Sequence, residues 1–142
     1  MEHLFLEGDS LKTFDDIYRE VGKIIRACNE WEQEFRELLS LAGVNSKTTT
    51  ASGLHKMNKL LHENKVLNDY EAEMLDKVID RRNYLVHMFF LEFRNYSLEE
   101  NSEILMATYY VINEARDVVA NKIDELNGIQ FGRRPTIFDK KS

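Results

Sequence analysis

Residues 11–39 are LKTFDDIYREVGKIIRACNEWEQEFRELL, and their hydrophobic periodicity sets the architecture expected for the whole chain. The apolar residues recur at intervals of three and four, the pattern of one face of an α-helix. They are Leu11, Phe14, Ile17, Tyr18, Val21, Ile24, Ile25, Cys28, Trp31, Phe35, Leu38 and Leu39. Ser10 or Thr13 can cap the start, Thr13 with Asp16 fits a capping box, and Gly43 can end the helix in a left-handed conformation. The pattern predicts one helix of roughly 30 residues, about 45 Å long.

Three further helices are expected after the loop GVNSKTTTASG, residues 43–53. A short helix runs from Leu54 to about His62, a third from the cap Asn68 to about Phe93, and a fourth from the capping residue Ser97 to the stop Asn127-Gly128. Three long helices and one short one predict an all-α fold, an antiparallel up-and-down four-helix bundle, in a single domain over residues 1–128. The tail 129–142 is expected to be partly disordered.

Composition supports one helical domain and excludes several classes of protein. The chain has 142 residues, a single Pro and a net charge of −6, and such an acidic balance is not typical of a general nucleic-acid binder. Cys28 is the only cysteine, so no disulfide is possible, and its place in an apolar stripe predicts a buried thiol. The first residues lack a secretory pattern and no apolar run is long enough to span a membrane, so we expect a cytoplasmic protein without membrane contact.

Two basic segments, residues 44–67 and 129–142, interrupt the acidic body of the chain. Their cations are Lys47, Lys56, Lys59, Lys65, Arg133, Arg134, Lys140 and Lys141. Together they could meet a phosphate backbone, and Lys56 and Lys59 are the candidates on the short helix. Solvated surface is the alternative interpretation of the same charges.

Familiar metal and nucleotide motifs are missing. A bundle di-iron site needs a glutamate three residues before a histidine. The residues three positions before His55, His62 and His87 are Ser52, Lys59 and Tyr84. The sequence also lacks a glycine-rich phosphate loop, a serine nucleophile elbow and a Cys-x-x-Cys pair. We therefore expect no metal and no cofactor, and His55 and His62 are predicted to be surface residues.

The segment DKVIDRRNYLVHMFFLEF, residues 76–93, places polar residues inside an apolar helical pattern. Arg82 takes a seam position between aliphatic neighbours, where an unpaired guanidinium would be heavily penalised. Asn83 and His87 are four residues apart and so lie almost above one another. Either the three residues lie at the solvent edge, with Asn83 hydrogen-bonded to His87, or they line a cleft or subunit interface. There His87 could move protons and Arg82 could hold a phosphate.

Arg82, four intervening residues and His87, with Asn83 directly after the arginine, resemble the R-x(4–6)-H motif of HEPN domains. These are small all-helical proteins often found as toxin or defence ribonucleases. The resemblance implies metal-independent RNA cleavage, as the toxin of a toxin–antitoxin or phage-defence system with a cognate antitoxin protein. In that interpretation His87 is the general acid or base, Arg82 stabilises the phosphorus centre, and Asn83 orients His87 or contacts the phosphate.

In the same interpretation Arg81 supplies a second positive charge, in addition to that of Arg82. Arg81, Lys56 and Lys59 are then the candidate RNA-binding residues. In HEPN toxins paired with nucleotidyltransferase antitoxins the motif often continues His-x-Tyr, whereas here it continues His87-Met88-Phe89. Phe89 has no hydroxyl, so the tyrosine modification of that subgroup is not expected.

Helical geometry bears on how the motif could work. Five residues separate Arg82 and His87 by about 140° around a helix axis, so one regular helix does not place them side by side. A two-fold homodimer that pairs equivalent helices would gather both motifs in one cleft, as the composite sites of the family imply. The competing class is a non-catalytic helical interaction module, HEPN-like or unrelated, that binds RNA or protein.

Overall fold

The computed structural model describes residues 13–44 and 53–128, and all regular structure within them is helical. The elements are α1 (Phe14–Leu41), α3 (Leu54–Glu63), α4 (Asp69–His87), α5 (Phe89–Glu92), the 3-10 helix η2 (Phe93–Asn95) and α6 (Leu98–Leu126). The predicted all-α class is confirmed for this part of the chain. The predictions for the tail 129–142, and for the cations of that tail and of residues 45–52, fall outside the described residues.

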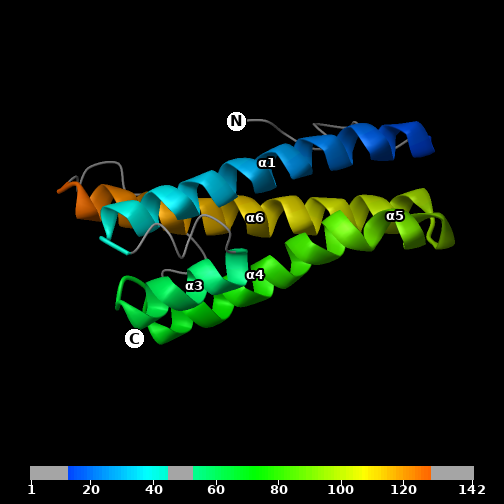
Figure 1. Cartoon of the computed structure of the whole chain (residues 1–142). Coiled ribbons are helices and arrows are strands. Elements are labelled where there is room, and N and C mark those ends of the chain that lie inside the picture. The colour runs from blue at the N-terminus through cyan, green and yellow to red at the C-terminus, as the bar shows by residue number, and fades with distance from the viewer. Residues whose placement is uncertain (1–12, 45–52, 129–142) are drawn as a thin grey trace.

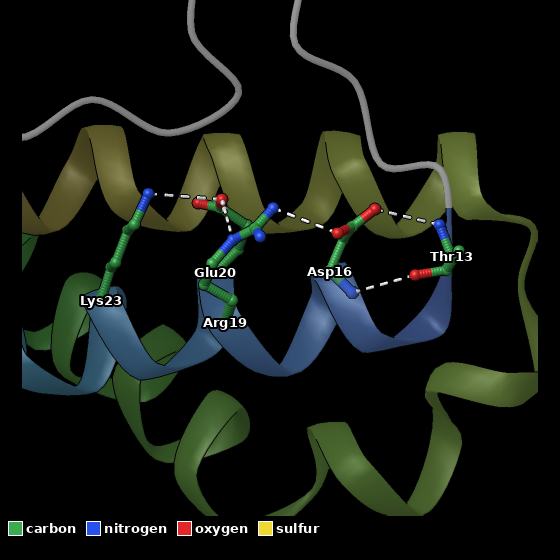
Figure 2. A network of polar contacts seen from close by, with 5 residues as sticks. All are labelled: Thr13, Asp16, Arg19, Glu20 and Lys23. Carbon is green, nitrogen blue, oxygen red and sulfur yellow. Dashed lines mark hydrogen bonds and ion pairs between the residues drawn. The ribbon is translucent and has the colours of Figure 1, made fainter.

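Side-chain caps set the start of each long helix, as the sequence predicts. The Thr13 hydroxyl accepts from the Asp16 amide at 3.4 Å while the Asp16 carboxylate accepts from the Thr13 amide at 3.0 Å (Figure 2). Reciprocal boxes of the same kind begin α4 at Asn68 and α6 at Ser97. Because each box satisfies two amide donors that the first helical turn leaves free, short polar motifs fix these boundaries.

Further along the first two turns of α1, Glu20 is buried among charged neighbours (Figure 2). One of its oxygens lies 3.4 Å from the Lys23 amine and 3.7 Å from the Arg19 guanidinium, while the other has no hydrogen-bond partner within the described structure. At the far end Gly43 has a φ of +76°, the left-handed conformation predicted for the stop of this helix.

The core lies where α1 packs along α6, and α4 packs beside them and contributes further buried residues (Figure 1). Trp31 and Phe35 from α1, Leu75 from α4, and Leu105 and Ile112 from α6 are fully buried. Within the described ranges, no helix combines the length and the apolar character needed to cross a bilayer.

The directions of the long helices differ from the predicted antiparallel order. Phe14 contacts Phe93 just before α6 begins, and Glu34 binds Arg116 further along both helices, so α1 and α6 run in the same direction (Figure 1). Lys122 and Glu71 lie 3.2 Å apart, which joins the end of α6 to the start of α4, so α4 runs opposite to α6. The order differs because α3 runs in the same direction as α1 (Figure 1). The helix direction therefore changes between α3 and α4 and again between α4 and α6.

The prediction that one helix continues to about Phe93 is wrong, because α4 ends at His87. Met88, with φ −115° and ψ −27°, breaks the helix before α5 and η2. Phe89 and Phe93 are buried here and pack on each other, and Phe93 also contacts the rings of Phe14 and Tyr18 of α1. Aromatic packing therefore decides the path here over local periodicity.

Helix α3 docks on α4 through polar contacts. His55 bridges two turns of α4, with Nδ1 3.0 Å from Asp76 Oδ1 and Nε2 2.9 Å from Asp80 Oδ1. His62 Nε2 lies 2.7 Å from Asp69 Oδ1, so both predicted surface histidines contact aspartates of α4. Partial burial alone would lower the pKa of His55, but the hydrogen bonds to Asp76 and Asp80 outweigh it and raise the pKa above the ordinary value.

This contact predicts a pH dependence of stability. A histidine whose pKa is raised by folding contributes stability that is complete below its unfolded pKa, about 6.5, and is lost as pH rises through the folded value. We expect the difference in unfolding free energy between wild type and His55→Gln to shrink above about pH 6.5 in urea denaturation. In an Asp76→Asn/Asp80→Asn background the difference should no longer shrink as pH rises, because the contacts that raise the pKa of His55 are gone. A difference that still shrinks there would contradict this origin.

Candidate functional site

Arg82 lies on the face of α4 that is turned toward α1, with 19% of its side chain exposed. Nη1 donates to Asn83 Oδ1 at 2.9 Å, and Nη2 lies 3.7 Å from Glu32 Oε1 of α1. Nε is buried and has no hydrogen-bond acceptor among the residues that the structure describes. Arg82 therefore takes the expected seam position, and its positive charge faces the Glu32 carboxylate of α1. Their separation is too long for a hydrogen bond.

A stronger ion pair lies further along α1. Arg116 of α6 donates through Nε and Nη2 to both oxygens of Glu34, at 2.9 and 3.0 Å, and Nη1 lies 3.7 Å from Glu30. The hydrogen bonds to Glu34 raise the pKa of Arg116. Sequence reasoning missed this pair, although Glu30 and Glu34 form an i,i+4 row on α1 and Arg116 lies directly after the buried Ala115.

The thiol of Cys28 lies close enough to both arginines for their charges to act on it. Burial raises the pKa of Cys28 to about 11, and the charges of Arg82 and Arg116 offset part of that rise. The thiol is therefore neutral near pH 7, which makes it a poor nucleophile. The prediction of a buried thiol is confirmed.

His87 is the last residue of α4, and its side chain is exposed. No hydrogen bond joins it to Asn83 within the described residues, and the Asn83 oxygen accepts from Arg82 instead. Arg82 thus points inward and His87 outward, as the expected 140° separation requires. One copy of the chain brings Arg82 and Asn83 together but leaves His87 apart.

Exposed apolar residues flank His87 in the sequence. The α4–α5 patch, as we call it, consists of Val86, Met88, Phe90 and Leu91, with exposed fractions of 37%, 44%, 43% and 74%. Phe90 also stacks on Tyr18 of α1, with ring centroids 5.4 Å apart. A group of exposed apolar residues beside a polar candidate residue is typical of an interaction surface.

The three predicted RNA-binding cations lie on different parts of the molecule. Arg81 lines a groove between α4 and α6, whereas Lys56 and Lys59 are exposed on α3. The structure therefore does not gather the three into one cluster with Arg82. As for metals, no three His, Cys, Asp or Glu side chains in residues 13–44 and 53–128 lie close enough together to hold an ion. Catalysis without metal stays a prediction.

No protein-family model matches the chain, and neither the curated proteins nor the solved structures provide a match. The HEPN resemblance therefore depends on the motif residues and on the all-helical fold around them.

The unequal contacts of the two arginines predict unequal costs of removal. Arg116→Met breaks two charge-assisted hydrogen bonds and should lower the free energy of unfolding by about 1–2 kcal/mol. Arg82→Met keeps the apolar stem and loses only a long ion pair and one neighbouring bond, so we expect a loss of about 0.5 kcal/mol or less. Urea denaturation of both variants measures this, and equal losses would mean that Arg82 serves mainly to stabilise the fold.

Proposed function

We propose that this chain is a HEPN-like endoribonuclease that cleaves RNA without a metal ion and acts as a homodimer. The observation that carries the proposal is the Arg82-Asn83-x-x-x-His87 pattern on α4, in which His87 is exposed beside the α4–α5 patch. A HEPN-like four-helix arrangement and a role as the toxin of a toxin–antitoxin or phage-defence system, held in check by an antitoxin protein, belong to the same proposal.

The chemistry is transphosphorylation within the RNA strand. His87 takes the proton of a ribose 2′-hydroxyl, and the oxygen attacks the adjacent phosphorus. The bond from phosphorus to the 5′-oxygen breaks, and that oxygen receives a proton from an imidazolium. The products are a 2′,3′-cyclic phosphate and a 5′-hydroxyl end, and Arg82 stabilises the charge that develops on the phosphoryl oxygens.

Two features of the contacts support this use of Arg82. Its ion pair with Glu32 is 3.7 Å long, so a phosphate that offers two hydrogen bonds would compete well for the guanidinium. Asn83 holds the other side of the guanidinium at 2.9 Å and so limits its orientation. Two copies related by a two-fold axis would place two His87 rings in one cleft, one as base and the other as acid.

The first test is cleavage of mixed single-stranded RNA in EDTA. We expect wild type to cleave and to leave 2′,3′-cyclic phosphate or its 3′-phosphate product. His87→Ala and Arg82→Ala should each lose at least about 100-fold in rate, the typical contribution of acid–base or charge-stabilising groups. His62→Ala is the matched histidine control and should stay active. Full activity of His87→Ala would refute the proposed role.

A second test concerns the dimer. If the α4–α5 patch is the interface, light scattering at micromolar concentration should give a dimer for wild type and a monomer for Leu91→Asp, because a carboxylate would be buried without a partner. Leu91 is suitable because its side chain is highly exposed, so the substitution should change the free energy of unfolding of the monomer little. Met106→Asp, at an exposed apolar position of α6, is the control and should remain dimeric. A monomeric wild type would contradict the composite site.

The alternative function is a non-catalytic helical module that binds RNA or protein. It is favoured by the contacts that the Arg82 guanidinium already makes within the chain, with Asn83 and Glu32. Equal inactivity of wild type and both variants on several RNAs, together with a marked stability loss in Arg82→Met, would select this function over the nuclease.

A further inference from the structure

A groove of about 650 Å³ runs between α4 and α6, on a different face of α4 from Arg82. It lies within the size range of sites that bind small molecules. Its floor is formed by Ile104, Ala107 and Thr108 of α6. The Thr108 hydroxyl donates to the Ile104 carbonyl at 2.7 Å and is thereby engaged by its own helix. The short side chain of Ala107 leaves space above a mainly apolar floor, which suits a flat apolar group.

The α4 wall of the groove carries two cations one helical turn apart, Lys77 and Arg81. Among the described residues, the ion-pair contact of Lys77 is with the exposed Glu73, at 3.8 Å. Arg81 makes no ion pair in the described part of the chain, although Glu103 lines the opposite wall. Two weakly engaged cations at this spacing can hold a phosphate group from one side.

The acidic residues of the groove restrict the ligand further. Asp80 also lines the groove but is bonded by His55 Nε2 at 2.9 Å, whereas Glu103, on the α6 wall, makes no such contact with His55. A carboxylate repels a simple polyanion, so the ligand needs hydrogen-bond donors as well as a phosphate. A guanine base offers N1–H and N2–H side by side, which matches the two oxygens of one carboxylate.

Tyr84 supplies an aromatic surface at the same groove. Partial burial and a hydrogen bond to Glu92 raise the pKa of its phenol. Bases of single-stranded RNA stack on such rings. Tyr84 is three residues before His87 on α4, hence about one turn away, so a nucleotide in the groove would lie next to the proposed cleavage position.

We propose that the α4–α6 groove is a subsite for one guanine nucleotide of the RNA strand, with its phosphate at Lys77 and Arg81, its base on Tyr84 and its Watson–Crick edge at Glu103. The subsite rests on the proposed ribonuclease function for its place beside the cleavage position. It makes the enzyme prefer guanine next to the scissile phosphate.

The test separates binding from cleavage. Fluorescence anisotropy in a His87→Ala background uses labelled oligouridine RNAs that carry one guanine or one adenine. We expect the guanine RNA to bind at least fivefold more tightly, Glu103→Gln to remove most of that preference, and Arg81→Ala to weaken both RNAs at least fivefold. Ala107→Phe, which fills the groove, should weaken the guanine RNA about tenfold, while the controls Met106→Phe and Arg26→Ala should bind normally.

Guanosine 5′-monophosphate, titrated into wild type and followed by NMR, provides a readout that needs no cleavage. We expect chemical-shift changes centred on Tyr84 and Ala107 that are stronger than with adenosine 5′-monophosphate and absent in Ala107→Phe. This result supports the subsite even if wild type cleaves no RNA. Absence of cleavage would overturn only the nuclease proposal. Active enzyme whose Ala107→Phe and Glu103→Gln variants fold and bind both probes like wild type would overturn the subsite alone. Absence of guanine preference in both assays would also overturn it.

Discussion

Burial of the apolar stripe of α1 against α6 is the interaction on which the other features depend. Ile24, Trp31 and Phe35 lose all contact with water there, and each large side chain buried in this way contributes roughly 1.5–3 kcal/mol. The two helices touch along much of their length, so their polar edges are placed by the same packing. Arg116 can reach Glu34 with two hydrogen bonds only because the stripe sets the register between α1 and α6.

Local sequence signals predicted the helices and their starts well. Thr13, Asn68 and Ser97 each cap a helix in the predicted way, and Gly43 and Gly128 take positive φ at the predicted stops. These features depend on residues within one turn of each other, so no tertiary information is needed. The break at Met88 was not predictable in this way, because its gain comes from aromatic rings of α1 that are distant in sequence.

The candidate site shows the same division. The periodicity correctly indicated that Arg82 faces the interior and needs a partner, and that His87 lies on another side of α4. The partner itself, Glu32, could not be chosen from the sequence, since α1 carries several glutamates and only the register between helices selects one. The groove that holds Arg81 and Tyr84 could not be predicted from the sequence either, because it exists only where α4 and α6 meet.

The parallel course of α1 and α6 also shapes how this chain must fold. Their contacts join distant segments, as in Arg116 and Glu34, which are 82 residues apart. By contrast α3 and α4 are neighbours in sequence and can pair as soon as both are made. Closing a long loop costs entropy before its contacts form, which slows folding relative to bundles built from successive hairpins. During synthesis α1 therefore has to wait for α6, the last described helix, before its aromatic stripe is covered.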